Sequence, residues 1–161
     1  MKKKNSKYLK AINLFSMQDK VVVIFGGSGK LGQQFSKTLR NNGAKVYVLD
    51  IKKRINEKNI SFLKSDVQKK NNINNAIAKI IKKEKKIDTV IYNIYSKPKN
   101  YYKNFQDYDL NTWKKVIDSN LTGAFLVSQI AIKNFLKRKI HGNIIFLSST
   151  YGVVGPDPSI Y

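Results

Sequence analysis

The chain has 161 residues, 42% of them hydrophobic, which is enough for one domain with a buried core. The absence of cysteine excludes disulfide bonds and thiolate metal sites, and a single histidine argues against a histidine-rich metal centre. The formal net charge of +21 comes from basic residues spread along the chain, so we expect solvated lysine-rich surfaces and no specific nucleic-acid partner.

Targeting signals are not evident. No apolar run approaches the roughly 20 residues that a membrane span requires. The first residues, MKKKNSKYLKAINLF, lack the continuous apolar segment of a signal peptide. We therefore expect a cytoplasmic protein with no membrane partner, in which residues 1–13 form a basic extension and residues 14–161 form one domain.

A glycine-rich segment follows the first predicted strand. Val21 to Phe25 are branched or aromatic apolar residues, typical of a strand buried on both faces. Gly27, Gly29 and Gly32 fit a G-x-G-x-x-G fingerprint, and Gly26 with Gly29 and Gly32 offers a second register, G-x-x-G-x-x-G. Such a loop lets backbone amides approach a pyrophosphate at the positive end of the next helix. A plain turn between strand and helix is the alternative.

The second predicted strand, Lys45 to Asp50, ends in an acid where the fingerprint expects one. A carboxylate there accepts hydrogen bonds from both hydroxyls of an adenosine ribose and repels the additional phosphate of NADP, so it favours NAD. Lys30 in the glycine loop and Lys52 and Lys53 just after Asp50 leave NADP as an alternative cofactor. The alternative for Asp50 itself is a turn residue that ends the strand.

The third predicted strand, Ile60 to Lys64, leads through Ser65, Asp66 and Val67 into a helix whose apolar residues share one side. Asp66 has two interpretations, because its carboxylate can accept a hydrogen bond from the amino group of an adenine ring or from the free N–H groups that begin the helix. The sequence alone favours the helix cap.

A fourth strand, Asp88 to Asn93, is followed by an irregular segment as far as Asp109, and a loop of that length commonly borders a site. Asn111 to about Lys137 has the apolar spacing of one long helix, in which Asn120 is a polar residue among apolar ones. Asn120 is therefore either a hydrogen-bonded boundary residue or one that holds water or a backbone group beside an active site.

The fifth predicted strand, Asn143 to Leu147, ends in Ser148, Ser149 and Thr150, and His141 before it is interpreted as an exposed turn residue. Strands and helices alternate, which is the pattern of right-handed βαβ units. We predict an α/β fold with a Rossmann-type, doubly wound parallel sheet in the order 3-2-1-4-5. Its ligand would lie at the switch between strands one and four.

From about Leu14 to Tyr161 the chain resembles the short-chain dehydrogenase/reductase family. Five segments carry the resemblance in the family's order: Phe25 to Gly32 for T-G-x-x-x-G-x-G, Asp66-Val67 for the adenine-contacting Asp-Val, Asp88 to Tyr95 for D-x-x-V-N-N-A-G, Asn120 to Phe125 for N-L-x-G-x-F, and Asn143 to Gly152 for the serine-bearing strand. The resemblance implies NAD as cofactor, with NADP as the alternative, and no metal. The implied cofactor-binding residues are Gly26, Gly27, Ser28, Gly29, Lys30, Leu31, Gly32, Asp50, Asp66, Val67 and Asn93.

The chain departs from the family's pattern at three places. Phe25 replaces a threonine, Lys30 replaces a glycine, and the residues from Tyr92 to Tyr95 replace N-N-A-G. The glycine register, Asn-x-Tyr after strand four and Ser-Ser-x-Tyr-Gly look most like a bacterial branch associated with surface-polysaccharide and flagellin-sugar biosynthesis.

Family members transfer a hydride between a nicotinamide cofactor and a carbonyl or alcohol carbon of a small molecule. By resemblance, Ser149 positions the substrate oxygen and Asn120 sustains a proton relay. The family's proton donor is a tyrosine whose pKa is lowered by a lysine one helical turn later. Tyr95 and Lys99 have this spacing, but Pro98 would disrupt the helix that must align them.

The resemblance therefore predicts a domain truncated before the Tyr-x-x-x-Lys helix, with the last strands of the sheet missing and no activity of its own. The complete family member is expected to be a homo-oligomer. The alternative function is a nucleotide-binding module that performs no chemistry.

Overall fold

The computed structural model describes residues 14–155, 157 and 159, and its centre is a five-stranded sheet in the predicted order β3-β2-β1-β4-β5. All four neighbouring strand pairs are parallel. The strands are β1 (Val21–Phe25), β2 (Lys45–Asp50), β3 (Ile60–Lys64), β4 (Thr89–Tyr92) and β5 (Asn143–Phe146). The Rossmann-type α/β fold is thereby confirmed, while the predicted extension of residues 1–13 lies outside the described residues.

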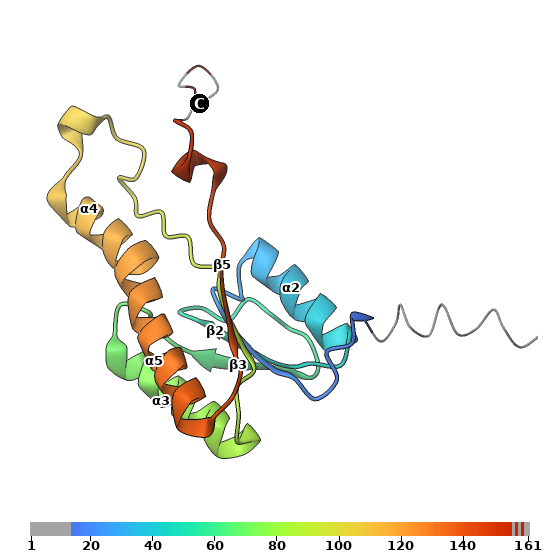
Figure 1. Cartoon of the computed structure of the whole chain (residues 1–161). Helices are drawn as coiled ribbons and strands as arrows, with labels where there is room; N and C mark the ends of the chain where they lie inside the picture. Colours follow the sequence, from blue (N-terminus) through green and yellow to red (C-terminus); the bar gives the residue numbers. More distant parts are fainter. Residues whose placement is uncertain (1–13, 156, 158, 160–161) are drawn as a thin grey trace, which may run out of the picture.

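Helices cover both faces of this sheet (Figure 1). The regular ones are α2 (Lys30–Asn41), α3 (Lys70–Glu84), α4 (Leu110–Ile117) and α5 (Gly123–Arg138), and the short turns are η1 (Phe105–Asp107), η2 (Asp118–Thr122) and η3 (Thr150–Gly152). One face packs against α3 and α5 and the other against α2. The sheet is therefore doubly wound, with more helical cover on one face than on the other.

The central strand β1 is buried on both sides, as its run of branched residues predicts. Val21, Val23 and Phe25 contact the core beneath α3 and α5. Val22 and Ile24 contact the core beneath α2. Because both faces are apolar, β1 fixes the position from which the glycine loop leaves the sheet.

The long helix predicted from Asn111 to about Lys137 is confirmed as one unbroken helical run, in which η2 is a π-helical turn between α4 and α5. The favoured interpretation of Asp66 is wrong. Asp66 does not cap α3, whose N-cap residue is Lys69. Instead, Asp66 Oδ1 accepts a hydrogen bond from the Gln68 N–H at 3.0 Å and makes a turn before the helix.

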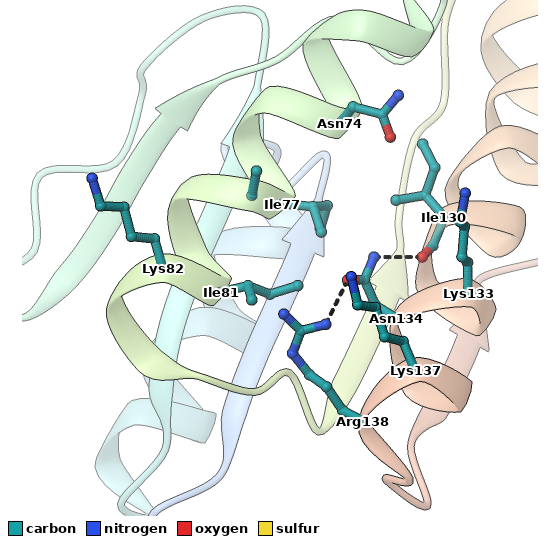
Figure 2. A pocket seen from close by; sticks show the side chains of 10 residues that line it. Asn74, Ile77, Ile81, Lys82, Ile130, Lys133, Asn134, Lys137 and Arg138 are labelled. Carbon is teal, nitrogen blue, oxygen red and sulfur yellow. Dashed lines mark hydrogen bonds between the residues drawn. The ribbon is translucent and has the colours of Figure 1, made fainter.

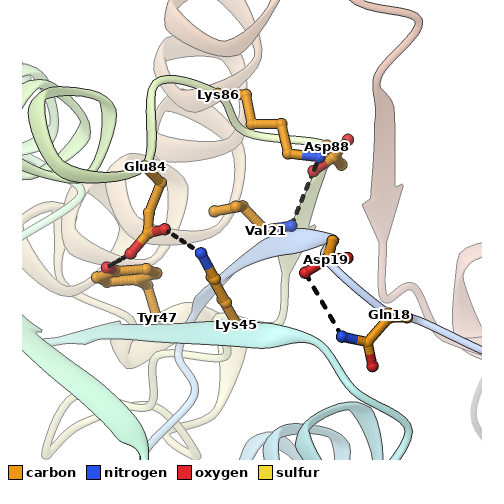
Figure 3. Close-up of polar contacts among 8 residues, drawn as sticks. All are labelled: Gln18, Asp19, Val21, Lys45, Tyr47, Glu84, Lys86 and Asp88. Carbon is orange, nitrogen blue, oxygen red and sulfur yellow. Dashed lines mark hydrogen bonds and ion pairs between the residues drawn. The ribbon is translucent and has the colours of Figure 1, made fainter.

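Polar contacts join the elements at the amino end of the sheet (Figure 3). Asp88 Oδ2, just before β4, accepts a hydrogen bond from the Val21 N–H of β1 at 2.8 Å. Glu84, at the end of α3, accepts the Tyr47 hydroxyl at 2.6 Å and pairs with Lys45 Nζ at 2.9 Å. Hydrogen bonds from Tyr47 and Lys45 hold the pKa of Glu84 below its usual range. These contacts stabilise the edge of the sheet opposite the cavity described next.

Candidate functional site

A cavity of about 600 Å³ lies at the carboxyl ends of the strands, and loops that follow β1, β2, β3 and β4 line it. The strand order reverses between β1 and β4, which is where open α/β sheets bind ligands. Eight of the predicted cofactor residues line it, namely Gly26, Gly29, Lys30, Leu31, Asp50, Asp66, Val67 and Asn93. The fold thus gathers residues from four separate segments around one space.

Glycines in the loop after β1 meet different requirements. Gly26 has φ +75°, and a Cβ there would collide with the Asn93 carbonyl oxygen. A Cβ on Gly32 would lie 2.5 Å from the Gly26 carbonyl oxygen, so the tight contact between loop and α2 requires glycine. A Cβ on Gly29 would meet only the Gly26 carbonyl oxygen, at 3.4 Å, which is an ordinary contact. Packing does not require glycine at 29, and its bare backbone at the start of α2 leaves room for a ligand.

Gly27 and Ser28 are buried and do not line the cavity, and neither does Gly32. The Ser28 N–H donates to Asp50 Oδ2 at 3.1 Å, and the Lys52 N–H donates to Asp50 Oδ1 at 3.4 Å. Asp50 therefore connects the glycine loop to the end of β2. A carboxylate offers about four acceptor positions, so Asp50 retains capacity for further donors from the cavity.

The end of β3 contributes a buried polar group. Ser65 lines the cavity with only 2% of its surface exposed, and its N–H donates to the Asp50 carbonyl oxygen at 3.0 Å. Its hydroxyl finds no hydrogen-bond partner among the described residues. Asp66 and the buried Val67 continue this wall. A bare glycine loop at the start of a helix is a feature that a bound nucleotide would explain.

The π-helical turn η2 closes the cavity beside β4. The Tyr92 hydroxyl donates to the Ser119 carbonyl oxygen, and burial raises the pKa of Tyr92 so that the hydroxyl keeps its proton. Gln68 Nε2 donates to Ser119 Oγ at 2.6 Å. Asn120 Oδ1 accepts the Ser96 N–H at 3.1 Å. Hydrogen bonds thus connect this turn to three neighbouring segments. Turns of π-helix occur frequently at functional sites.

The two predicted catalytic residues do not line the cavity. Asn120 lies next to Ser119, which does. Ser149 is exposed after β5, where its Oγ accepts the Tyr151 N–H at 3.2 Å at the start of η3. Tyr95 and Lys99 lie on the irregular segment after β4 and not on a helix. The Tyr-x-x-x-Lys spacing there produces no aligned pair.

Several lining residues were missed by the sequence reasoning: Ile51, Arg54, Ser65, Gln68, Ile94, Ser96 and Ser119. Most of them stand within a few positions of a predicted strand end, which is the signal that could have identified them. Four cations line the cavity, Lys30, Lys52, Arg54 and Lys97, together with the two carboxylates of Asp50 and Asp66. The excess of positive charge suits a ligand with two negative charges.

A second cavity, of about 510 Å³, lies between α3 and α5 (Figure 2). Its lining includes Ile77, Ile81 and Ile130, and carries no carboxylate, hydroxyl or imidazole. Two of its lining residues form a hydrogen bond, in which Arg138 Nη1 donates to Asn134 Oδ1 at 3.2 Å. This cavity lacks the groups that the first one gathers.

Within the described residues, no three histidine, aspartate or glutamate side chains come close enough to hold a metal ion. The same part of the chain contains no helix with the length and apolar character needed to cross a bilayer.

The sequence model of the family described as short chain dehydrogenase matches residues 20–160. The chain belongs to this family. An uncharacterized oxidoreductase of Staphylococcus saprophyticus is 32% identical to it over 156 residues, which cover 91% of this chain and 61% of the relative. An NAD-dependent glycerol dehydrogenase of Listeria innocua is 29% identical over 153 residues, with coverage of 91% and 59%.

Solved structures of family members show the same fold. A short chain dehydrogenase from Leptospira borgpetersenii with bound NAD+ matches with a TM-score of 0.84 at 26% identity, covering 91% of this chain and 57% of that one. The aldohexose dehydrogenase of Thermoplasma acidophilum matches with a TM-score of 0.78 at 25% identity, covering 89% and 55%. The chain spans 61% and 59% of the two curated relatives.

Proposed function

We propose that this chain is the cofactor-binding part of an NAD(P)-dependent short-chain oxidoreductase acting on a small carbonyl or alcohol compound. The observation that carries the proposal is the cavity at the strand switch, where the glycine loop, Asp50 and Asp66 line one space. Bound there, the nicotinamide cofactor supplies or accepts the hydride.

Each wall of the cavity has a role in this proposal. The backbone at Gly29 and the start of α2 receive the pyrophosphate, assisted by Lys30. Asp50 accepts the ribose hydroxyls and thereby favours NAD. Asp66 and Val67 hold the base, and Asn93 holds the loop in shape because its Nδ2 donates to the Gly26 carbonyl oxygen at 3.1 Å. Lys52 and Arg54 beside Asp50 keep NADP as the alternative cofactor.

The chemical step needs a proton donor at the substrate oxygen. We assign the oxygen-positioning role to Ser149 and the relay role to Asn120, by resemblance to the family. In the part of the chain that the structure describes, no tyrosine and lysine lie one helical turn apart on a helix, so we propose that this chain binds cofactor without turnover. The second candidate is a nucleotide-binding module that performs no chemistry. It is favoured because Ser149 is exposed to solvent and does not line the cavity.

The substrate we propose is a polyhydroxylated small molecule. The names of two relatives, a glycerol and an aldohexose dehydrogenase, support a polyhydroxylated substrate and agree with a role in surface-sugar biosynthesis. We propose a homo-oligomer because four apolar side chains along α5 and the turn before it remain 48–74% exposed. They are Leu121 in η2 and Phe125, Ile132 and Leu136 in α5.

Calorimetric titration with NAD and NADP tests the cofactor proposal. We expect wild type to bind NAD more tightly than NADP. Asp50→Asn should weaken NAD binding about tenfold or more, because hydrogen bonds from the ribose to a charged acceptor are lost. Glu57→Gln, which removes the same charge at an exposed ion pair with Lys37, should change neither affinity. Absence of binding by wild type to either dinucleotide would refute the proposal.

Turnover is measured separately on the same preparation. With glycerol or a hexose and saturating NAD, we expect binding but no formation of reduced cofactor by the 161-residue chain. A turnover rate ordinary for a dehydrogenase would show that other residues of this chain supply the proton donor, and would overturn the assignment made above.

A further inference from the structure

The segment after β4 places one lysine among three tyrosine rings. Lys97 Nζ lies 4.9 Å from the ring centroid of Tyr95 and 4.9 Å from that of Tyr102. The centroid of the Tyr101 ring is 5.8 Å from the same nitrogen. Tyr101 packs edge-on against both other rings, and its hydroxyl lies 3.0 Å from that of Tyr95. Because ring faces attract a cation at these distances, this tyrosine cluster holds the Lys97 ammonium in a defined place.

Lys97 keeps its charge and retains hydrogen-bonding capacity. Its Nζ donates to the Tyr102 hydroxyl oxygen, and this hydrogen bond and the neighbouring Tyr95 hydroxyl raise the pKa of the ammonium. An ammonium has three N–H groups, so at least one is left for a ligand. None of the ion pairs formed by the described residues includes Lys97. A positioned cation without a carboxylate partner is suited to bind an oxyanion.

The tyrosine cluster lies on the β4 side of the cavity at the strand switch. Tyr95, Ser96 and Lys97 all line this cavity. In the sheet, β4 is on the other side of β1 from β2, which ends in Asp50. The Ser96 N–H donates to Asn120 Oδ1 at 3.1 Å, which connects the cluster to the residue assigned the relay role. A dinucleotide whose ribose is held at Asp50 therefore leaves Lys97 at the end of the cavity where a substrate would lie.

We propose that Lys97 and the tyrosine cluster form a substrate subsite that binds an oxyanion, a carboxylate or a phosphate group, carried by the polyhydroxylated substrate. This inference rests on the function proposed above and narrows its substrate class to anionic compounds. The free N–H of Lys97 donates to the oxyanion. Tyr95 and Tyr102 are 64% and 72% exposed, so their rings have surface left to pack against the carbon skeleton of the ligand.

Titrations followed by amide NMR spectra test this subsite with three probes, glucose, glucuronate and glucose 6-phosphate, in the presence of saturating NAD. The probes share a hexose skeleton and differ in charge. We expect at least one of the two anions to bind about tenfold more tightly than glucose, the effect of a hydrogen bond to a charged group. The same anion should shift the amide signals of residues 95–97, and the anion that is preferred identifies the oxyanion. Equal affinities for all three probes would refute the inference.

Variants of Lys97 separate its charge from a structural role. Lys97→Met removes the charge and should bind the three probes equally, with the NAD affinity of wild type. Lys97→Arg keeps the charge and should retain the preference for the anion. Lys103→Met is the matched control, because it removes the same charge from an exposed lysine of this segment that does not line the cavity. This control should show the wild-type preference.

The outcomes distinguish this inference from the proposed function. Wild type that does not bind NAD refutes the proposed function and this inference with it. Wild type that binds NAD without preferring an anion refutes only the role of Lys97. A preference that survives in Lys97→Met would place the anion at another cation and overturn the assignment. Weaker NAD binding by Lys97→Met, or equal losses for glucose and the anions, would show that Lys97 serves the cofactor or the shape of the segment instead.

Discussion

Single residues in the loop after β1 divide into those that the fold requires and those that a ligand requires. The positive φ of Gly26 and its closeness to the Asn93 carbonyl oxygen are conditions of the native backbone. Gly29 has φ −73°, which any residue adopts, and only one atom near its missing Cβ. The same residue type is therefore present for two physical reasons, and alanine substitution separates them.

Gly26→Ala should lower the free energy of unfolding by about 1–2 kcal/mol or more, from left-handed backbone strain and the collision with Asn93. Gly29→Ala should change it by no more than about 1 kcal/mol. NAD affinity should nevertheless fall about tenfold in Gly29→Ala, because the added methyl group occupies the approach to the helix N-terminus. Urea unfolding and calorimetric titration measure the two quantities. Equal stability losses in the two variants would contradict this division.

At the scale of elements, η2 is fixed by contacts that come from other parts of the chain. Tyr92 of β4 donates to the Ser119 carbonyl oxygen, and Gln68, just before α3, donates to Ser119 Oγ. The turn therefore depends on the packing of the long helix against the sheet and not on its own sequence. The Tyr92 hydroxyl supplies a donor to the Ser119 carbonyl oxygen from outside the helix.

Tyr92→Phe should lower the free energy of unfolding by about 1–3 kcal/mol, because it leaves a buried carbonyl oxygen without this donor. Amide hydrogen exchange of residues 118–122 should accelerate more than that of α3. Tyr102→Phe, at an exposed tyrosine of the irregular segment, is the control and should change stability by less than about 0.5 kcal/mol. Unchanged exchange at η2 in Tyr92→Phe would show that the turn is fixed by other contacts.

The contact between α3 and β2 at the opposite edge depends on pH. The pKa of Glu84 is lowered in the fold by hydrogen bonds from Tyr47 and Lys45. A lowered pKa stabilises the fold above the usual glutamate range near 4.3 and loses that contribution as pH falls through the folded value. Wild type should therefore exceed Glu84→Gln in stability at neutral pH, and the difference should shrink below about pH 4.

Chemical denaturation at pH 7, 5, 4 and 3 checks this dependence. Glu57→Gln, at an exposed ion pair, serves as the control and should show little difference from wild type at any of these pH values. A difference for Glu84→Gln that stays constant from pH 7 to pH 3 would mean that the carboxylate contributes no ionic stabilisation.

The sequence predicted elements well where one local pattern decides them. Val21 to Phe25 could only be a strand buried on both faces, and the structure has it as β1 with both faces packed. The sequence failed where a distant residue decides. The π-turn at Ser119 receives a hydrogen bond from Tyr92, and the turn at Asp66 precedes a helix whose N-cap residue is Lys69. Ser65 was missed because a hydroxyl without a partner becomes visible only when its neighbours are in place.

At the scale of the whole molecule, the large positive charge and the exposed apolar surface have opposite effects on association between copies of the chain. The net charge of +21 causes copies of the chain to repel one another. The α5 strip of Leu121, Phe125, Ile132 and Leu136 and the edge strand β5, where Ile145 and Phe146 are about half exposed, favour association. Salt screens the repulsion between charges and does not weaken the association of apolar surfaces, so ionic strength determines whether the copies associate.

The chain should therefore sediment as a smaller species in about 0.1 M NaCl, where the Debye length is about 10 Å, than in about 1 M, where it is about 3 Å. If copies pair through the α5 strip, Phe125→Lys should suppress the larger species, because pairing would bury an added charge. Ile145→Lys adds the same charge to β5 and should leave that pairing intact. The reverse result, with only Ile145→Lys suppressing association, would mean that copies meet through the open sheet edge. The homo-oligomer proposed from the helix would then be wrong.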